Sequence, residues 1–214
     1  MTIVEPTDTV ERELFAAGTH LVIGCDEVGR GALAGPVAVG MVVLSATCGP
    51  HPDGLRDSKL LSEKRRVELD PLVRGWAMNH AVGMADATEV DEVGIIAALG
   101  LAGKRALADL FEQGVDVTSA VILLDGAHNW LAPALAHPLD IRTRIKADRD
   151  CVSVAGASVI AKVRRDTLMI EHDAVLPGYG WRGNKGYSSS EHMEAIARLG
   201  ASVLHRRTWL SVSA

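Results

Sequence analysis

The sequence predicts an α/β fold, in which apolar strands alternate with amphipathic helices. Three strand-like runs, at 21–23, 120–124 and 141–146, each lead into a carboxylate. Two long helical patterns, over 88–112 and 151–172, separate or follow these runs. Because sites in α/β sheets form beyond the carboxyl ends of the strands, the acids that follow these runs are the first candidates for function.

The stretch 24–36, GCDEVGRGALAGP, carries Asp26 and Glu27 at the end of the first run, followed by a glycine-rich turn with Arg30. Two adjacent carboxylates at the end of a buried strand repel each other and resist the loss of water unless a positive charge neutralises them. A hard divalent cation such as Mg²⁺ does so with few acidic ligands. This stretch alone leaves an alternative equally open, in which the acids cap a turn or pair with Arg30.

The glycine spacing here also imitates a dinucleotide-binding fingerprint. That motif needs a strand, a turn and then a helix whose N-terminus faces the pyrophosphate. Gly35-Pro36 intervenes instead, and 37–44 is a second apolar, strand-like run. Since strand, loop, strand is the wrong context, the sequence argues against a nicotinamide cofactor.

The composition is that of an ordinary globular domain. The chain has 214 residues, of which 48% are hydrophobic and 23% charged, enough for one domain with a small appendage. Neither an export signal nor a membrane-spanning run is visible, so we expect a cytoplasmic protein with no membrane partner. Three widely spaced cysteines match no zinc or disulfide pattern, and Cys25 is typical of a small core residue.

The charge is distributed unevenly along the chain. The net charge of −5 argues mildly against a nucleic-acid partner, but residues 1–140 hold 10 Lys and Arg against 20 Asp and Glu, whereas 141–214 hold 12 against 7. A basic C-terminal third beside an acidic N-terminal part is compatible with a polyanion bound next to an acidic metal pocket.

The remaining elements follow from caps and periodicity. Ser62 begins a helix with i,i+4 charge pairs, 77–84 forms a third strand, and Thr88 with Asp91 resembles a capping box that opens one long helix to about 112. A serine run at 188–190 caps a last helix.

The helix predicted over 151–172 has a second, polar face. Ser158, Lys162 and Arg165 share this face, which suits a phosphate. An ion pair between Lys162 and Asp166 is the simpler alternative, and this helix alone favours it.

The segment 177–209 is rich in glycine, basic residues and aromatic residues. Its loop, GYGWRGNKGY at 178–187, contains Lys185 and Tyr187. A ring that stacks on a base or sugar beside cations that reach phosphates is typical of a nucleic-acid contact.

Seven motifs in one order resemble bacterial ribonuclease HII over about 24–209, nearly the whole chain. They are GCDEVGRGALAGP, DSK at 57–59 with Leu61-Ser62 following, LLDG at 123–126, KAD at 146–148, SVAGASVIAKVRRD at 153–166, NKGY at 184–187 and HRRTW at 205–209. Each motif is weak alone, and their order makes the resemblance specific.

The resemblance implies a ribonuclease H-like fold, with a central mixed five-stranded sheet flanked by helices and a helical C-terminal extension. We expect an N-terminal tail at 1–18, a catalytic core at 19–172 and the extension at 173–214. The family cleaves the RNA strand of RNA–DNA hybrids and nicks duplex DNA 5′ of embedded ribonucleotides, leaving 3′-hydroxyl and 5′-phosphate ends. We expect a monomer whose partners are these nucleic acids.

The resemblance also assigns residues. The family's four acids, which hold Mn²⁺ or Mg²⁺, fall on Asp26, Glu27, Asp125 and Asp148. Its loop that recognises the ribonucleotide 2′-hydroxyl falls on Gly29, Arg30 and Gly31, and its deoxyribose-packing tyrosine falls on Tyr187. Phosphate contacts carry over to Lys59, Ser158 and Lys162.

The chemistry of the residues agrees with this assignment. Two divalent ions about 3.5–4 Å apart activate water and stabilise the leaving oxygen in phosphodiester hydrolysis. We assign Asp26 and Asp125 as shared ligands, Glu27 as a ligand or water-orienting group, and Asp148 as ligand of the ion that activates water. The family pattern differs at Leu60, Gly94, Ala147 and Gly156, none of which changes a carboxylate.

Two other classes of protein remain as alternatives. A non-catalytic hybrid-binding protein predicts a missing carboxylate, yet all four are present. A resolvase or exonuclease of the same fold has similar acids, but the glycine-arginine loop with the downstream Lys-Gly-Tyr favours recognition of a ribonucleotide.

Overall fold

A single mixed sheet organises residues 5–210, which the computed structural model describes. Its five strands have the order β3-β2-β1-β4-β5. β1 (Leu21–Val28) pairs antiparallel with β2 (Val37–Ser45), and β2 pairs antiparallel with β3 (Asn79–Ala85). β4 (Ala120–Asp125) and β5 (Asp140–Arg144) run parallel to β1 on its other side. The predicted α/β fold with a five-stranded mixed sheet is confirmed.

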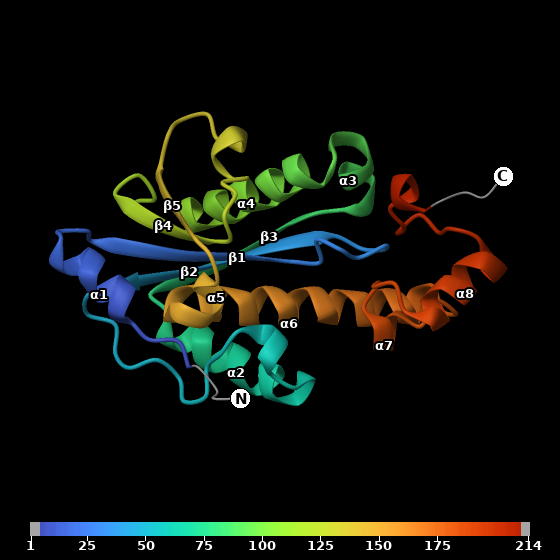
Figure 1. Ribbon diagram of the computed structural model, residues 1–214, viewed down its shortest axis with the longest axis horizontal. Coiled ribbons are helices and arrows are strands. Elements are labelled where there is room, and N and C mark those ends of the chain that lie inside the picture. The colour runs from blue at the N-terminus through green and yellow to red at the C-terminus, as the bar shows by residue number, and fades with distance from the viewer. Residues whose placement is uncertain (1–4, 211–214) are drawn as a thin grey trace.

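Helices cover both faces of this sheet (Figure 1). α4 (Ile95–Glu112) packs on β2 and β3, whereas α6 (Val152–Val175) crosses β1 and β2 on the opposite face with α2 (Glu63–Trp76) against it. The shorter helices are α1 (Thr9–Ala16), α3 (Ala87–Val93), α5 (Ala147–Asp150), α7 (Trp181–Asn184) and α8 (Ser190–Leu199), with 3₁₀ turns η1 (Ser58–Leu60), η2 (Ala132–Ala134) and η3 (Arg207–Trp209). Within residues 5–210 no helix combines the length and apolar character needed to cross a bilayer.

The position of β2 in the sheet explains why its sequence is a continuous apolar run and does not alternate between apolar and polar residues. Every residue from 37 to 44 is buried, because α4 covers one face of the strand and α6 covers the other. A strand covered on both faces has no solvated side on which a polar residue is favoured. The sheet centre therefore forms the floor of two apolar layers.

Two glycines let α6 approach the sheet closely. A Cβ atom at Gly24 in β1 would overlap the backbone of Ser153 and Val154, and one at Gly40 in β2 would overlap the carbonyl of Ala157. Glycine is needed here because the helix backbone rests directly on the strand. α6 is thereby fixed beside the end of β1 that carries Asp26.

The helix predicted over 88–112 is in fact two helices. Gly94 takes φ +78° and separates α3 from α4, and the capping box that opens α3 is formed by Asp86 and Glu89 rather than by Thr88 and Asp91. Asp91 instead accepts hydrogen bonds from the backbone N–H groups of Arg207 and Thr208, so it anchors the C-terminal segment. The prediction of Ser62 as a helix cap is confirmed, since its hydroxyl accepts from the Arg65 N–H.

The C-terminal segment beyond α6 packs at one end of the molecule (Figure 1). Its small core contains Tyr179, Trp181 and Ala195, which pack against Ala34 and Met169. The Tyr179 and Trp181 rings stack with their centroids 4.9 Å apart. This core joins the loop after β1 to the segment that carries Tyr187.

Candidate active site

The four predicted acids gather where β1 and β4 end. Asp26 and Glu27 lie near the end of β1, and Asp125 is the last residue of β4, its parallel neighbour. Asp148, on α5 beyond β5, donates its backbone N–H to Asp125 Oδ1 over 3.4 Å. Parallel pairing thus brings together carboxylates that lie far apart in the sequence.

Asp26 is a buried carboxylate with an unused oxygen. Its exposed fraction is 1%, and its Oδ1 accepts the Glu27 backbone N–H at 2.9 Å. Its Oδ2 is buried and has no hydrogen-bond partner among the described residues. Burial, followed by the charge of Glu27, raises the pKa of Asp26 well above its ordinary value. Because a buried oxygen without a donor is costly, this position favours a cation.

The neighbouring groups share this electrostatic environment. Burial is the main reason that the pKa values of Glu27 and Asp125 are raised, and the charge of Asp148 adds to the effect at Asp125. Lys59 Nζ donates to Asp148 Oδ2 at 3.1 Å. Burial lowers the pKa of Lys59, but the charge of Asp26 and the other nearby carboxylates outweigh burial and raise it. The acids therefore repel one another, and Lys59 supplies part of the positive charge that they need.

A cavity of about 220 Å³ opens over three of these acids, Asp26, Glu27 and Asp125. Its lining residues come from the ends of β1 and β4, the turn η1, the glycine-rich loop, α6 and the C-terminal segment: Asp26, Glu27, Val28, Gly29, Arg30, Gly31, Ser58, Lys59, Asp125, Lys162 and Tyr187. Within residues 5–210 no three acidic, His or Cys side chains are close enough to coordinate one ion in this arrangement. The lining residues thus form an acidic floor, from Asp26, Glu27 and Asp125, with cationic and aromatic side chains around it.

The glycine-rich loop forms one wall of the cavity. Gly29 takes φ +84°, and a side chain there would overlap the Arg165 guanidinium. A Cβ at Gly31 would meet open space, so this part of the backbone is accessible. Arg30 is about half exposed, with Nη1 3.6 Å from Glu27 Oε1. The predicted Arg30–Glu27 pair exists, but exposure and distance make it weak and leave the guanidinium free to contact a ligand.

Tyr187 forms another wall of the cavity, beside two cations of α6. Its ring centroid lies 5.5 Å from Lys162 Nζ and 5.2 Å from Arg165 Cζ. Lys162 also donates to Asp166 Oδ1 at 2.6 Å, so the ion pair favoured by the sequence is confirmed. Lys162 also lines the cavity. Its ammonium group therefore lies near the Tyr187 ring, pairs with Asp166 and borders the space that a ligand would occupy.

Comparison with known proteins identifies the family. A family model described as Ribonuclease HII matches residues 23–212. The chain belongs to the ribonuclease HII family. Among its relatives, the ribonuclease HII of Streptomyces griseus is 44% identical over 98% of this chain and 86% of its own. A ribonuclease HII of Thermus thermophilus is 43% identical over 90% of this chain and 88% of its own. The chain is therefore a ribonuclease H enzyme.

Solved structures agree on the ribonuclease HII fold. The ribonuclease HII in a PCNA complex from Archaeoglobus fulgidus superposes with a TM-score of 0.68 at 24% identity, covering 91% of this chain and 97% of that one. Bst-RNase HIII, solved in complex with Mn²⁺, gives 0.62 at 21% identity and covers 86% and 64%. At these identities the likeness supports the fold alone.

Two of the predicted nucleic-acid contacts, Ser158 from the resemblance and Lys185 from the composition of its loop, do not line the cavity. Ser158 is fully buried and donates to Ser58 Oγ at 2.7 Å, so it supports Ser58 instead of facing a phosphate. Lys185 is 6% exposed; its Nζ donates to the Arg182 carbonyl and lies 3.5 Å from Glu63 Oε2. The polar atoms of both residues are engaged inside the protein here, and a direct phosphate contact by Ser158 or Lys185 stays a prediction.

The sequence reasoning missed two residues beside the four candidate acids. Ser58 lines the cavity, and the fully buried Asp57 accepts the Lys59 N–H at 3.0 Å while its Oδ1 lies 3.8 Å from Lys59 Nζ. The DSK motif at 57–59 is the sequence signal that contains both residues. Asp57 therefore fixes the turn from which Lys59 reaches Asp148.

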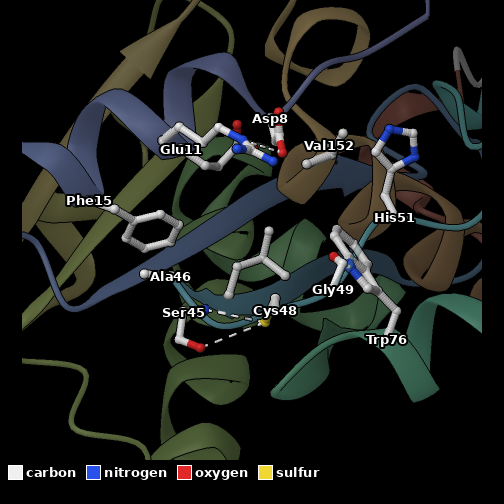
Figure 2. A pocket seen from close by; sticks show the side chains of 12 residues that line it. Asp8, Glu11, Phe15, Ser45, Ala46, Cys48, Gly49, His51, Trp76 and Val152 are labelled. Atoms are coloured by element: carbon white, nitrogen blue, oxygen red, sulfur yellow. Dashed lines mark hydrogen bonds and ion pairs between the residues drawn. The ribbon is translucent and has the colours of Figure 1, made fainter.

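A second cavity, of about 270 Å³, lies at the other end of β1 and β2 (Figure 2). Glu11 from α1 and Trp76 from α2 are among its lining residues. The Glu11 Oε1 accepts the Ser153 backbone N–H at 2.9 Å and its hydroxyl at 2.6 Å. Glu11 thus accepts a hydrogen bond from a backbone N–H at the start of α6 that has no partner within the helix. This role in the fold explains why a glutamate is buried here. None of the four candidate acids lines this cavity.

Proposed function

We propose that this chain is an endonuclease that hydrolyses the RNA strand of RNA–DNA hybrids and nicks duplex DNA 5′ of embedded ribonucleotides, with Mn²⁺ or Mg²⁺ as cofactor. The products have 3′-hydroxyl and 5′-phosphate ends. One observation carries the proposal: Asp26, Glu27 and Asp125 line the same cavity as Gly29–Gly31 and Tyr187. The residues assigned to cleavage and those assigned to recognition therefore face one ligand.

The acids fit a divalent cation. Asp26, Glu27, Asp125 and Asp148 offer hard oxygen ligands, and the unpartnered Oδ2 of Asp26 is an acceptor that no described donor satisfies. When bound, a pair of such ions supplies Lewis-acid stabilisation of the phosphodiester and a nucleophilic water. Burial, with the charges of neighbouring carboxylates adding to it, raises the pKa values of Asp26 and Asp125, and this supports the need for positive charge.

The walls of the cavity bind and orient the strand. Arg30, Lys59 and Lys162 provide positive charge for phosphate oxygens around the acidic floor. The open backbone at Gly31 lets a ribose approach closely, and a 2′-hydroxyl is the group that distinguishes RNA from DNA there. Tyr187 offers a ring face on which the next deoxyribose packs.

A uniform RNA–DNA hybrid tests the reaction class. The protein is incubated with the hybrid, labelled on its RNA strand, with Mg²⁺, with Mn²⁺ or with a chelator, and the product ends are probed with phosphatase and polynucleotide kinase. We expect internal cuts that require the divalent ion and that leave 5′-phosphate ends. Cutting that persists in the chelator, or that releases nucleotides from one end only, contradicts the proposal.

A further inference from the structure

Two arginines outside the acidic floor of the cavity are fully buried. Arg165 on α6 and Arg206 just before η3 both have an exposed fraction of 0%. Neither forms a salt bridge to a carboxylate among the described residues, and burial lowers the pKa of Arg206 to about 10. A buried charge without a carboxylate partner is expensive unless other groups solvate it. What solvates these two guanidiniums indicates what they do.

Arg206 is solvated by the glycine-rich loop. Its Nη2 donates to the Gly29 carbonyl at 2.8 Å, and its Nη1 donates to the Arg30 carbonyl at 2.9 Å. Its Nε and Nη2 both donate to the Gly35 carbonyl, at 3.2 and 3.1 Å. One planar guanidinium thus binds both ends of this loop from inside the protein, while the side chain of Arg30 remains on the cavity side.

Arg165 joins the same loop to the segment of Tyr187. Its Nε and Nη2 donate to the carbonyls of Pro36 and Ala34 at 2.8 and 3.0 Å. Its Nη1 donates to the Lys185 carbonyl at 2.9 Å, and its Cζ lies over the Tyr187 ring. A single side chain therefore fixes the distance between the two cavity walls.

Backbone hydrogen bonds complete this connection. The Leu33 N–H donates to the Gly186 carbonyl at 2.8 Å, and the Gly35 N–H donates to the Leu204 carbonyl at 2.8 Å. Ala34 also forms an antiparallel bridge with His205. A Cβ at Gly186 would overlap the Ala34 carbonyl, so the contact depends on glycine.

We propose that Arg206 and Arg165 are positioning residues that set ribonucleotide selectivity by holding the Gly29–Gly31 loop in register with Tyr187. This inference rests on the proposed function, because it concerns how that site reads a 2′-hydroxyl. Neither guanidinium is exposed, so neither contacts the strand itself. A rigid fork of donors that match several carbonyls is a property of arginine that lysine lacks.

The test is the binding preference for a ribonucleotide, measured without cleavage. The parent protein carries Asp125→Asn, and Kd is measured by fluorescence anisotropy in Mg²⁺ for a duplex with one embedded ribonucleotide and for the same duplex in all-DNA form. Adding Arg206→Lys, which keeps the charge, should reduce the preference for the ribonucleotide by about tenfold, since a misaligned hydrogen bond to the 2′-hydroxyl loses about 1.4 kcal/mol, which is tenfold in Kd. The Kd for the all-DNA duplex should change less than about twofold.

Two further variants make the result decisive. Arg198 is exposed on α8, so Arg198→Lys is the matched control and should leave both Kd values unchanged. Gly186→Ala pushes the Tyr187 segment away from the glycine-rich loop without altering any charge, and it should lower the same preference for the ribonucleotide. If circular dichroism shows that Arg206→Lys is unfolded, Gly186→Ala alone tests the positioning role. A preference that survives both Arg206→Lys and Gly186→Ala overturns the positioning role. A parent protein with no preference contradicts the proposed function, and this inference with it.

Discussion

Replacing Asp26 with asparagine should stabilise the protein while it abolishes cleavage. Asp26 is 1% exposed, its Oδ2 has no partner among the described residues, and Glu27 and Asp125 add repulsion. Asparagine has nearly the same shape, keeps the acceptor for the Glu27 N–H, and places an NH₂ donor among carboxylates. An uncompensated buried charge costs about 3–5 kcal/mol, and because Lys59 compensates part of it, we expect a gain of about 1–2 kcal/mol.

The assay is thermal unfolding in a chelating buffer and again with Mn²⁺ added. For a domain of this size the gain corresponds to a rise in Tm of about 2–8 °C. Mn²⁺ should raise the Tm of the wild type by mass action and have a smaller effect on Asp26→Asn. Asp53→Asn, which removes an exposed carboxylate, is the control and should change little. A Tm for Asp26→Asn below that of the wild type in chelator refutes the reasoning.

Three further predictions concern Asp125 in the cavity, Glu11 at the start of α6, and His205 in the C-terminal segment. Asp125→Asn should abolish cleavage while duplex binding, measured by anisotropy, stays within about threefold of wild type; loss of binding with an unfolded spectrum would make Asp125 structural. Glu11→Ala should lower the free energy of unfolding in urea by about 1–2 kcal/mol, because the Ser153 N–H loses its acceptor, whereas exposed Glu13→Ala should have little effect. His205, whose Nε2 lies 3.1 Å from that of His192, has a pKa lowered by burial to about 4. Since the unfolded chain binds its proton near pH 6.5, this group should cost about 2 kcal/mol of stability as pH falls from 7 to 5. Urea unfolding at both pH values should show a smaller loss for His205→Asn; an equal loss contradicts this assignment.

The positions of the acids could be predicted from the sequence because they depend on local patterns. An apolar run that ends in a carboxylate indicates a strand, and this held for both Asp26 and Asp125; Asp125 is the last residue of β4, whereas β1 continues two residues beyond Asp26. A local pattern also argued correctly against a dinucleotide site, because the run after Pro36 is a strand, β2, and not a helix. Asp148 was also expected just past such a run, at 141–146; β5 ends at Arg144, and Asp148 lies in the short helix α5 that follows.

Other features depend on contacts between distant segments, and the sequence could not indicate them. The spacing of Ser158 on a helix face suits a phosphate, but its hydroxyl is buried and bonded to Ser58, one hundred positions away along the chain. Arg206 resembles a surface cation in the sequence because it precedes Arg207, yet it lies under the loop after β1. The break at Gly94 was visible as a glycine, but glycines inside α4 do not break that helix, and local sequence does not distinguish the two cases.

A duplex with one embedded ribonucleotide tests the central claim most directly. The strand that contains the ribonucleotide is end-labelled, the protein is added with Mg²⁺ or Mn²⁺ or with a chelator, and the product is mapped to the nucleotide beside an all-DNA duplex of the same sequence. We predict one metal-dependent nick immediately 5′ of the ribonucleotide and none in the all-DNA duplex. Cleavage at other positions, or equal cleavage of both duplexes, would contradict recognition of the 2′-hydroxyl by Gly29–Gly31.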